Sequence, residues 1–295
     1  MTTEQMPAVS NPYSVFSEGS RVQKVTGWRL FLKTVYARAY PRLIGQQRER
    51  SWMFFDVFLP LLAVAAYVFV YRAIDAPEEY IGFVVVGGAM TAFWLNVLWS
   101  MSSQLYWEKE QGNLSLYIMA PNSLMAVLLG MALGGMLATA LRALAILVLG
   151  SILFRVQYEV ASFFQLFLVF MLTMVALYGM GMMTASLFLL LSREAWHISN
   201  LAQEPIYLMS GFYFPIRNLG FWVAAGASII PLTLGLDAMR QLVFPSGPAL
   251  GFLTVRTEII ILIVLSVVFV IGARYLLAYM ERLAIQQGRL TESRR

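Results

Sequence analysis

Long apolar segments separated by short polar ones fill most of the chain, and this pattern predicts helices that cross a membrane. Four stretches carry no charged residue: 80–107, 114–141, 160–192 and 259–273. A helix needs about 20 apolar residues to cross a bilayer, and these stretches lack the alternation that is typical of an outer-membrane strand. We therefore expect an all-α integral membrane protein with six spans, at about 52–71, 81–105, 124–154, 161–191, 198–216 and 256–277.

The segment 26–50, before the first expected span, predicts an amphipathic helix. Its apolar residues recur at helical spacing, and the basic residues Arg29, Lys33 and Arg38 occupy other positions. Such a helix suits the headgroup layer of a membrane, and a cytosolic helix docked on a partner is the alternative. The apolar positions are Trp28, Phe31, Leu32, Val35, Tyr36 and Ala39.

Basic residues fix the expected orientation. Eight of them precede the first span and four follow the last, so both ends should be cytoplasmic and the number of spans even. The apolar stretch 218–236 is interrupted by Gly and Pro, and we therefore predict a re-entrant hairpin on the outer side rather than a seventh span. The chain divides into a disordered tail 1–25, an interfacial helix 26–50, a transmembrane domain 51–280 and a basic cytoplasmic tail 281–295.

Composition agrees with this class. Hydrophobic residues make up 59% of the chain and charged residues 13%, which excludes an ordinary water-soluble domain. The net charge of +5 is modest, and we expect membrane lipids and no nucleic acid among the partners. The chain has no cysteine, and its one histidine, His197, has no convergent ligands in the sequence, so no metal site is expected.

The loop 106–123 is the only charged break in a long apolar run, and it predicts a short helix. Gly112 and Asn113 favour a helix start and Pro121 a stop. Leu114, Tyr117 and Ile118 then share one face, with an acidic rim from Glu108 and Glu110. Such a helix could fill a groove on a soluble partner. An interfacial turn whose apolar residues enter the lipid is the alternative.

Polar residues inside the expected spans are further candidates. Asn96, Ser100 and Ser103 form a stripe that either lines a substrate path or bonds to a neighbouring helix. Arg142 is expensive within a span, and we expect Glu204 as its partner, with separate wet cavities as the alternative. Gly130 and Gly134 form a G-x-x-x-G pair for close helix packing.

Two motifs resemble those of type-2 ABC exporter permeases, a family that exports polysaccharides, lipids and drugs. The run from Glu108 to Leu114 followed by Pro121 is similar to E-x-x-x-G-[TN]-L…P in the family's first cytoplasmic loop, with Asn113 where Thr is common. A later segment resembles S-G-x-x-F-P…P-L-T…D-x-x-R through Ser210, Gly211, Phe214, Pro215, Pro231, Leu232, Thr233, Asp237 and Arg240. The resemblance covers residues from about 27 to 280.

The resemblance implies a function for each motif. It identifies the loop 106–123 as a coupling helix that sits in a groove of a separate ATPase subunit. It also implies an outer gate at Gly211, Phe212, Tyr213, Phe214 and Pro215, for which an aromatic cluster at the membrane surface is the alternative. The sequence has no G-x-x-x-x-G-K-[ST], so ATP and Mg should bind to the partner, and this chain should not be an enzyme.

The expected function is therefore the permease subunit of an ATP-driven exporter in the inner (plasma) membrane. The resemblance implies a dimer, most simply of two identical permeases, with two ATPase subunits. The aromatic residues Phe93, Trp94 and Trp99 suit an amphipathic drug or a lipid-linked molecule, and a polysaccharide is the alternative. An ion-coupled secondary transporter should show inverted repeats and several carboxylates within the membrane, and an intramembrane enzyme should show clustered catalytic groups; the sequence favours neither.

Overall fold

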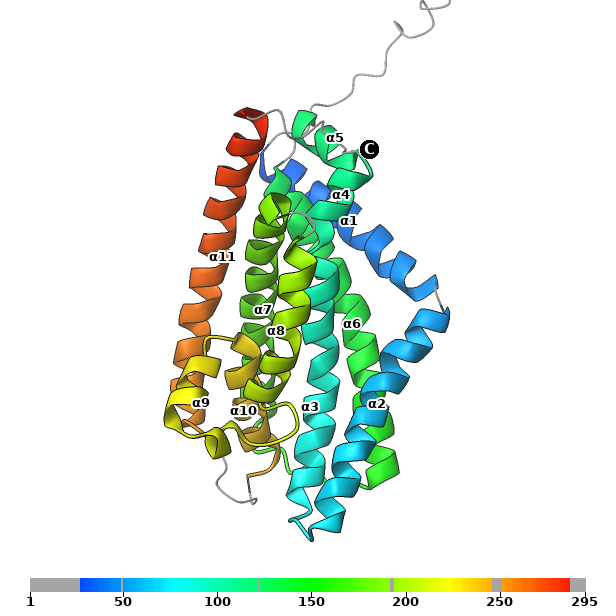
Figure 1. The fold of residues 1–295 in the computed structure, drawn as a ribbon, viewed down its shortest axis with the longest axis vertical. Coiled ribbons are helices and arrows are strands. Elements are labelled where there is room, and N and C mark those ends of the chain that lie inside the picture. Colours follow the sequence, from blue (N-terminus) through cyan, green and yellow to red (C-terminus); the bar gives the residue numbers. More distant parts are fainter. Residues whose placement is uncertain (1–26, 49, 121–122, 192–193, 246–250, 287–295) are drawn as a thin grey trace, which may run out of the picture.

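The computed structural model describes residues 27–48, 50–120, 123–191, 194–245 and 251–286, and these residues form helices and loops without a strand. The tail 1–25 and most of the basic tail 281–295 lie outside them. Four short helices, η2, α4, α5 and η3, connect or extend the longer ones (Figure 1). In chain order the helices are α1 (Trp28–Arg48), α2 (Arg50–Ala73), α3 (Glu79–Leu95), η2 (Asn96–Met101), α4 (Gln104–Glu110), α5 (Asn113–Met119), α6 (Leu124–Phe154), α7 (Phe163–Leu191), α8 (Glu194–Met209), η3 (Ile216–Leu219), α9 (Phe221–Ala227), α10 (Pro231–Val243) and α11 (Val255–Gln286).

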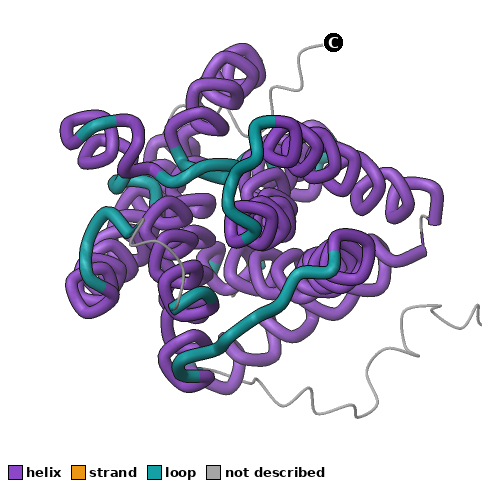
Figure 2. The backbone as a smooth tube through the Cα atoms, turned by 90° about the horizontal axis from the view of Figure 1, so that it is seen from below, coloured by secondary structure: helices purple, strands orange, loops and turns teal. Residues whose placement is uncertain are grey.

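The chain is an all-α integral membrane protein. Five helical segments are long and apolar enough to cross a bilayer, and they coincide with five of the six predicted spans. These segments are Met53–Ala73, Glu79–Glu110, Leu124–Phe154, Phe163–Phe188 and Val255–Leu283. Seen from below, the helices lie side by side in one bundle with loops across its end (Figure 2).

The predicted span 198–216 corresponds to α8, which is shorter and begins earlier than expected. Its 16 residues extend about 24 Å, less than the roughly 30 Å hydrocarbon thickness. The helix stops at Met209 because the chain turns at Gly211, whose φ of 69° is left-handed. α8 still runs along the bundle toward the end that carries α9 and α10 (Figure 1).

The predicted hairpin 218–236 appears as a sharply broken helix pair. α9 and α10 are bent by 110° at a short break, and Pro231 begins α10, where a missing backbone N–H costs nothing. α10 is buried along almost its whole length. It packs closely on α7, since a Cβ atom at Gly235 would overlap the side chain of Thr173.

Burial differs strongly among the spans. The most apolar window of the Glu79–Glu110 segment is 94% buried, whereas those of α2 and α11 are only 11% and 22% buried. α3 is therefore the central helix, with α2, α6 and α10 packed around it. α2 and α11 present most of their apolar surface outward.

α1 packs along α6 at the end of the bundle that also carries α5 (Figure 1). The G-x-x-x-G pair makes this contact possible, because Cβ atoms at Gly130 and Gly134 would press on the carbonyl oxygens of Val35 and Ala39. The two glycines thus bring α6 close to α1 rather than to another span. Trp28, Leu32 and Tyr36 on α1 stay exposed.

Candidate functional site

The α4–α5 turn lies at one end of the bundle, next to α1 (Figure 1). Gly112 lies between the two helices with φ 77°, a left-handed conformation that favours glycine. α5 begins at Asn113, as predicted. It ends at Met119, where Ala120 turns extended with ψ 148°, the conformation favoured before a proline. The predicted stop, Pro121, lies outside the described residues.

Glu108 organises this turn from inside. Its carboxylate accepts hydrogen bonds from Gln104 Nε2 at 3.0 Å, Asn113 Nδ2 at 3.1 Å and the Tyr117 hydroxyl at 2.8 Å. Its side chain is only 8% exposed. The expectation of Glu108 on an outward acidic rim is therefore corrected: three donors satisfy a buried carboxylate, which ties α4 to α5. Glu110 is exposed as expected.

The apolar face of α5 also points inward. Leu114 is 1% exposed and belongs to the chain's own core, so the expectation that it projects into a partner's groove is wrong. Tyr117 is partly buried against that core. The side chain of Ile118 lies outside the described residues. Leu116, 58% exposed, and Trp107, 47% exposed, are the large apolar side chains that this turn presents outward.

Tyr117 connects the turn to α1. The Arg38 guanidinium lies 4.1 Å from the centre of its ring, a cation–π contact. Burial, followed by the hydrogen bond to Glu108, raises the pKa of the Tyr117 hydroxyl to about 12. The hydroxyl therefore stays protonated and donates to the carboxylate at neutral pH.

Arg42 of α1 extends this network into the membrane-spanning helix, a role that the sequence did not indicate. Its guanidinium donates to Gln104 Oε1 and to Ser100 Oγ. Burial lowers the pKa of Arg42. Because Gln104 also donates to Glu108, polar contacts run without a break from Tyr117 on α5, through Glu108, Gln104 and Arg42, to Ser100 in η2.

The polar stripe lies in and just after the π-helix η2. Here the N–H of Ser102 donates to the carbonyl of Val97, five residues back, at 3.0 Å. Asn96 Oδ1 accepts from the Tyr178 hydroxyl at 3.0 Å, and Ser103 Oγ donates to the carbonyl of Trp99 at 2.6 Å. Asn96 and Ser100 thus bond to α7 and α1, the helix-contact alternative of the two predicted roles.

The segment Gly211–Pro215 is buried at the other end of the bundle. Phe212 is fully buried, and Tyr213 stacks on Tyr67 of α2 with ring centres 4.2 Å apart. Arg240 donates to the carbonyls of Gly211 and Phe212. A Cβ at Gly87 of α3 would overlap the Phe212 carbonyl, so only glycine permits this approach. Pro215 is also buried and Phe214 partly so.

Arg142 of α6 pairs with Asp56 of α2, not with Glu204. The Arg142 Nη1 to Asp56 Oδ2 contact is the one salt bridge within the described residues. Glu204 is exposed on α8 and accepts a long hydrogen bond, 3.4 Å, from neighbouring Gln203. The predicted pair is therefore corrected: α6 packs beside α2, which carries another acidic residue in its span.

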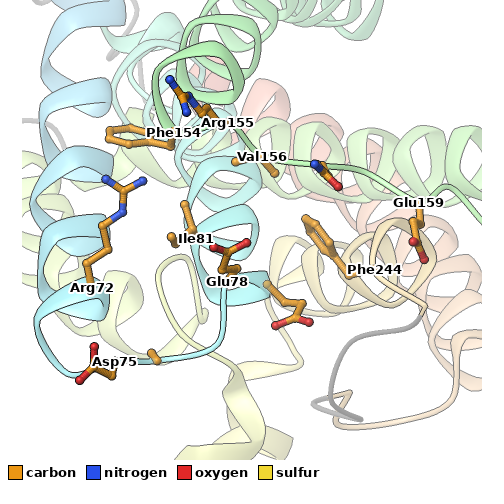
Figure 3. A pocket seen from close by; sticks show the side chains of 12 residues that line it. Arg72, Asp75, Glu78, Ile81, Phe154, Arg155, Val156, Glu159 and Phe244 are labelled. Atoms are coloured by element: carbon orange, nitrogen blue, oxygen red, sulfur yellow. The ribbon is translucent and has the colours of Figure 1, made fainter.

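Two hollows lie toward the α9–α10 end. A charged pocket of about 760 Å³ opens between the α2–α3 and α6–α7 loops (Figure 3). Figure 3 shows Arg72 and Arg155 near each other, with Glu78 and Glu159 toward the other side. An apolar groove of about 510 Å³ lies between α3, α6, α7 and α10 and includes Phe93, Phe167 and Phe170.

Comparison with known proteins is consistent with this geometry. The model of the ABC-2 type transporter family matches residues 32–244, from α1 to the end of α10. The matched range contains the α4–α5 turn, the stripe in η2 and the segment Gly211–Pro215. No curated protein matches the sequence.

Proposed function

Since the chain belongs to the ABC-2 type transporter family, we propose that it is the membrane subunit of an ATP-driven exporter and that a separate ATPase subunit drives it. The observation that carries this proposal is the α4–α5 turn, which is held rigidly at one end of the bundle and presents Leu116 and Trp107 outward. Gln111 and Glu110 are exposed beside them and provide a polar rim. We call Leu116, Trp107, Glu110 and Gln111 the docking face.

The contacts behind the docking face suggest how movement of an ATPase reaches the membrane. A push on α5 acts on Tyr117 and Glu108, which are linked through Gln104 and Arg42 to Ser100 in η2. Charge-assisted hydrogen bonds of this kind are directional and short, so they transmit displacement better than a loose apolar contact. ATP and Mg bind to the ATPase in this proposal.

The exposed side of α2 supports a dimer of two permease chains with two ATPase subunits. Phe54, Phe58 and Leu62 are each at least 43% exposed, and the first two rings stack at 5.2 Å. A contiguous aromatic surface of this kind is suited to a second copy of the chain. The end that carries α5 is cytoplasmic, and the membrane is the inner (plasma) membrane.

The apolar groove supports an amphipathic, drug-like or lipid-linked cargo over a polysaccharide. Its wall is almost entirely apolar and rich in aromatic rings, among them Phe93 of the central helix. Burying apolar area is the main source of affinity for such ligands, whereas a sugar chain needs many hydrogen-bond partners.

The proposal is tested by removing the docking face. We expect Trp107→Ala with Leu116→Ala to weaken co-purification with the ATPase encoded beside this chain at least tenfold, because each anchor contributes roughly 1–3 kcal/mol. ATP hydrolysis by the purified complex should lose its stimulation by cargo. Leu137→Ala on α6, a leucine of similar exposure far from α5, is the matched control.

Both variants should enter the membrane and elute as wild type, because neither changes a buried residue. Wild-type co-purification and hydrolysis in the Trp107→Ala, Leu116→Ala variant would show that the ATPase docks elsewhere and would remove the main support for the proposed mechanism.

A further inference from the structure

Two carboxyl groups are buried together where α10 meets the start of α11. Asp237 of α10 is 5% exposed and Glu258, in the first turn of α11, is 0% exposed. They lie within hydrogen-bonding reach of each other. A carboxylate in such surroundings needs either a cation or enough hydrogen-bond donors.

The donors around the pair are too few. The Gln241 amide nitrogen lies 3.4 Å from Asp237 Oδ2, 3.2 Å from Glu258 Oε2 and 2.9 Å from the carbonyl of Leu253. This nitrogen carries two hydrogens for those three acceptors. The backbone N–H of Phe252 serves only Asp237, at 2.7 Å. Glu258 Oε1 is buried and has no partner within the described residues.

No described cation neutralises the pair. Arg240 lies one turn from Asp237, but its guanidinium donates to the carbonyls of Gly211, Phe212 and Phe83 and forms no salt bridge with either acid. Arg256, on the same turn of α11 as Glu258, is exposed. The Tyr71 hydroxyl donates to the carbonyl of Tyr213 at 2.9 Å.

We propose that Asp237 and Glu258 form a proton-binding site in which Glu258 carries the proton and donates it to Asp237. Two like charges cannot both persist in one buried site, and a single proton removes one of them. It also supplies the missing donor. Asp237 is the ionised member because a backbone N–H bonds to it, whereas Glu258 shares only the Gln241 amide. The proton thereby fastens the α9–α10 hairpin to α11.

Infrared spectroscopy of the purified full-length protein in lipid nanodiscs tests the site directly. We expect a carbonyl stretch from a protonated carboxyl group at neutral pH, displaced in D2O, which disappears in Glu258→Gln. It should persist in Glu204→Gln, which changes an exposed acid. In Asp237→Asn it should persist at a displaced frequency, because the proton keeps its carrier but changes its acceptor.

Stability supplies an independent readout. The Glu258→Gln amide imitates the neutral acid and can still donate to Asp237, so this variant should melt like the wild type, whereas Glu258→Ala should melt lower. A wild type without the band, a band that survives Glu258→Gln, or a Glu258→Gln variant that melts as low as Glu258→Ala overturns the proposal. Loss of the band in Asp237→Asn alone also overturns it, because the proton would then reside on Asp237. None of these measurements depends on transport activity.

Discussion

At the scale of single residues, the α4–α5 turn depends on two unlike features: a buried carboxylate and a left-handed glycine. Glu108 satisfies donors from both helices, and Gly112 sets the angle between them. Neither feature involves much apolar burial. The aim of α5 is therefore set by a few polar contacts and one backbone conformation.

Gly112→Val should misdirect α5. A Cβ there would meet nothing within 4 Å, so the cost comes from the backbone alone, roughly 1–2 kcal/mol for a residue that disfavours a φ of 77°. We expect faster amide hydrogen exchange across α5 and weaker co-purification with the ATPase. Gly226→Val, at a position equally open but without a positive φ, is the control. Equal effects of the two substitutions would contradict this explanation.

Tyr117 should make stability depend on pH in the alkaline range. Its pKa is raised to about 12 in the folded protein, against about 10 in an unfolded chain, so its neutral form is preferred on folding. That stabilisation is complete below pH 10 and is lost as the pH rises from about 10 to about 12. The difference in unfolding free energy between wild type and Tyr117→Phe should be constant below pH 10 and shrink above it. A difference that stays constant to pH 12 would refute the buried hydrogen bond.

At the scale of helices, α2 is attached to the bundle mainly on one side, and its pairing with α6 includes a charged contact. Arg142 and Asp56 are 14% and 38% exposed, so water screens the pair in part. Its value for the fold therefore lies in selecting which face of α2 meets α6.

A double-mutant cycle distinguishes Asp56 from Glu204 as the partner of Arg142. We expect Arg142→Gln to destabilise the protein more than Arg142→Gln with Asp56→Asn, by an interaction energy of about 0.5–3 kcal/mol, because removing both members leaves no unpaired charge. Glu204→Gln should add independently to Arg142→Gln. Thermal unfolding in one detergent measures all the variants. Additivity for Asp56 would mean that the contact has no energetic role.

Helix positions followed from the sequence more fully than the directions of their side chains. Apolar length alone located five spans, since bilayer thickness fixes that length. The stripe of Leu114 and Tyr117 was also real, but periodicity does not tell what a stripe faces, and this one covers the chain's own core. Arg42 was missed because its partners are about 60 residues away in the sequence, in a helix that α1 reaches only after folding.

At the scale of the whole molecule, the two ends of the bundle differ in kind. One carries α1, α5 and the last turns of α11, and the other carries α9, α10 and the charged pocket (Figure 1). The chain runs the length of the bundle six times, with α8 as the shortest passage (Figure 1). Both ends of the described chain therefore lie on the α5 side.

Single cysteines test this sidedness cleanly, because the chain has none of its own. Glu78→Cys and Asn218→Cys, both at exposed positions on the α9–α10 end, should react with an impermeant thiol reagent in intact cells. Gln111→Cys should react only after the membrane is permeabilised. Reaction of Gln111→Cys from outside would reverse the assigned orientation and remove the ATPase from the α5 side.

The wide turn in η2 makes chain length at that point a control of angle. A π-helical turn holds one residue more than an α-helical turn, and each residue of an α-helix advances about 100° around the axis. Deleting one residue from 96–101 would restore an ordinary helix and swing α4 and α5 about the axis of α3 by about 100°, while shortening the helix by only about 1.5 Å. In homologous chains, a one-residue gap here would alter the compass bearing of the docking face and leave its depth nearly unchanged.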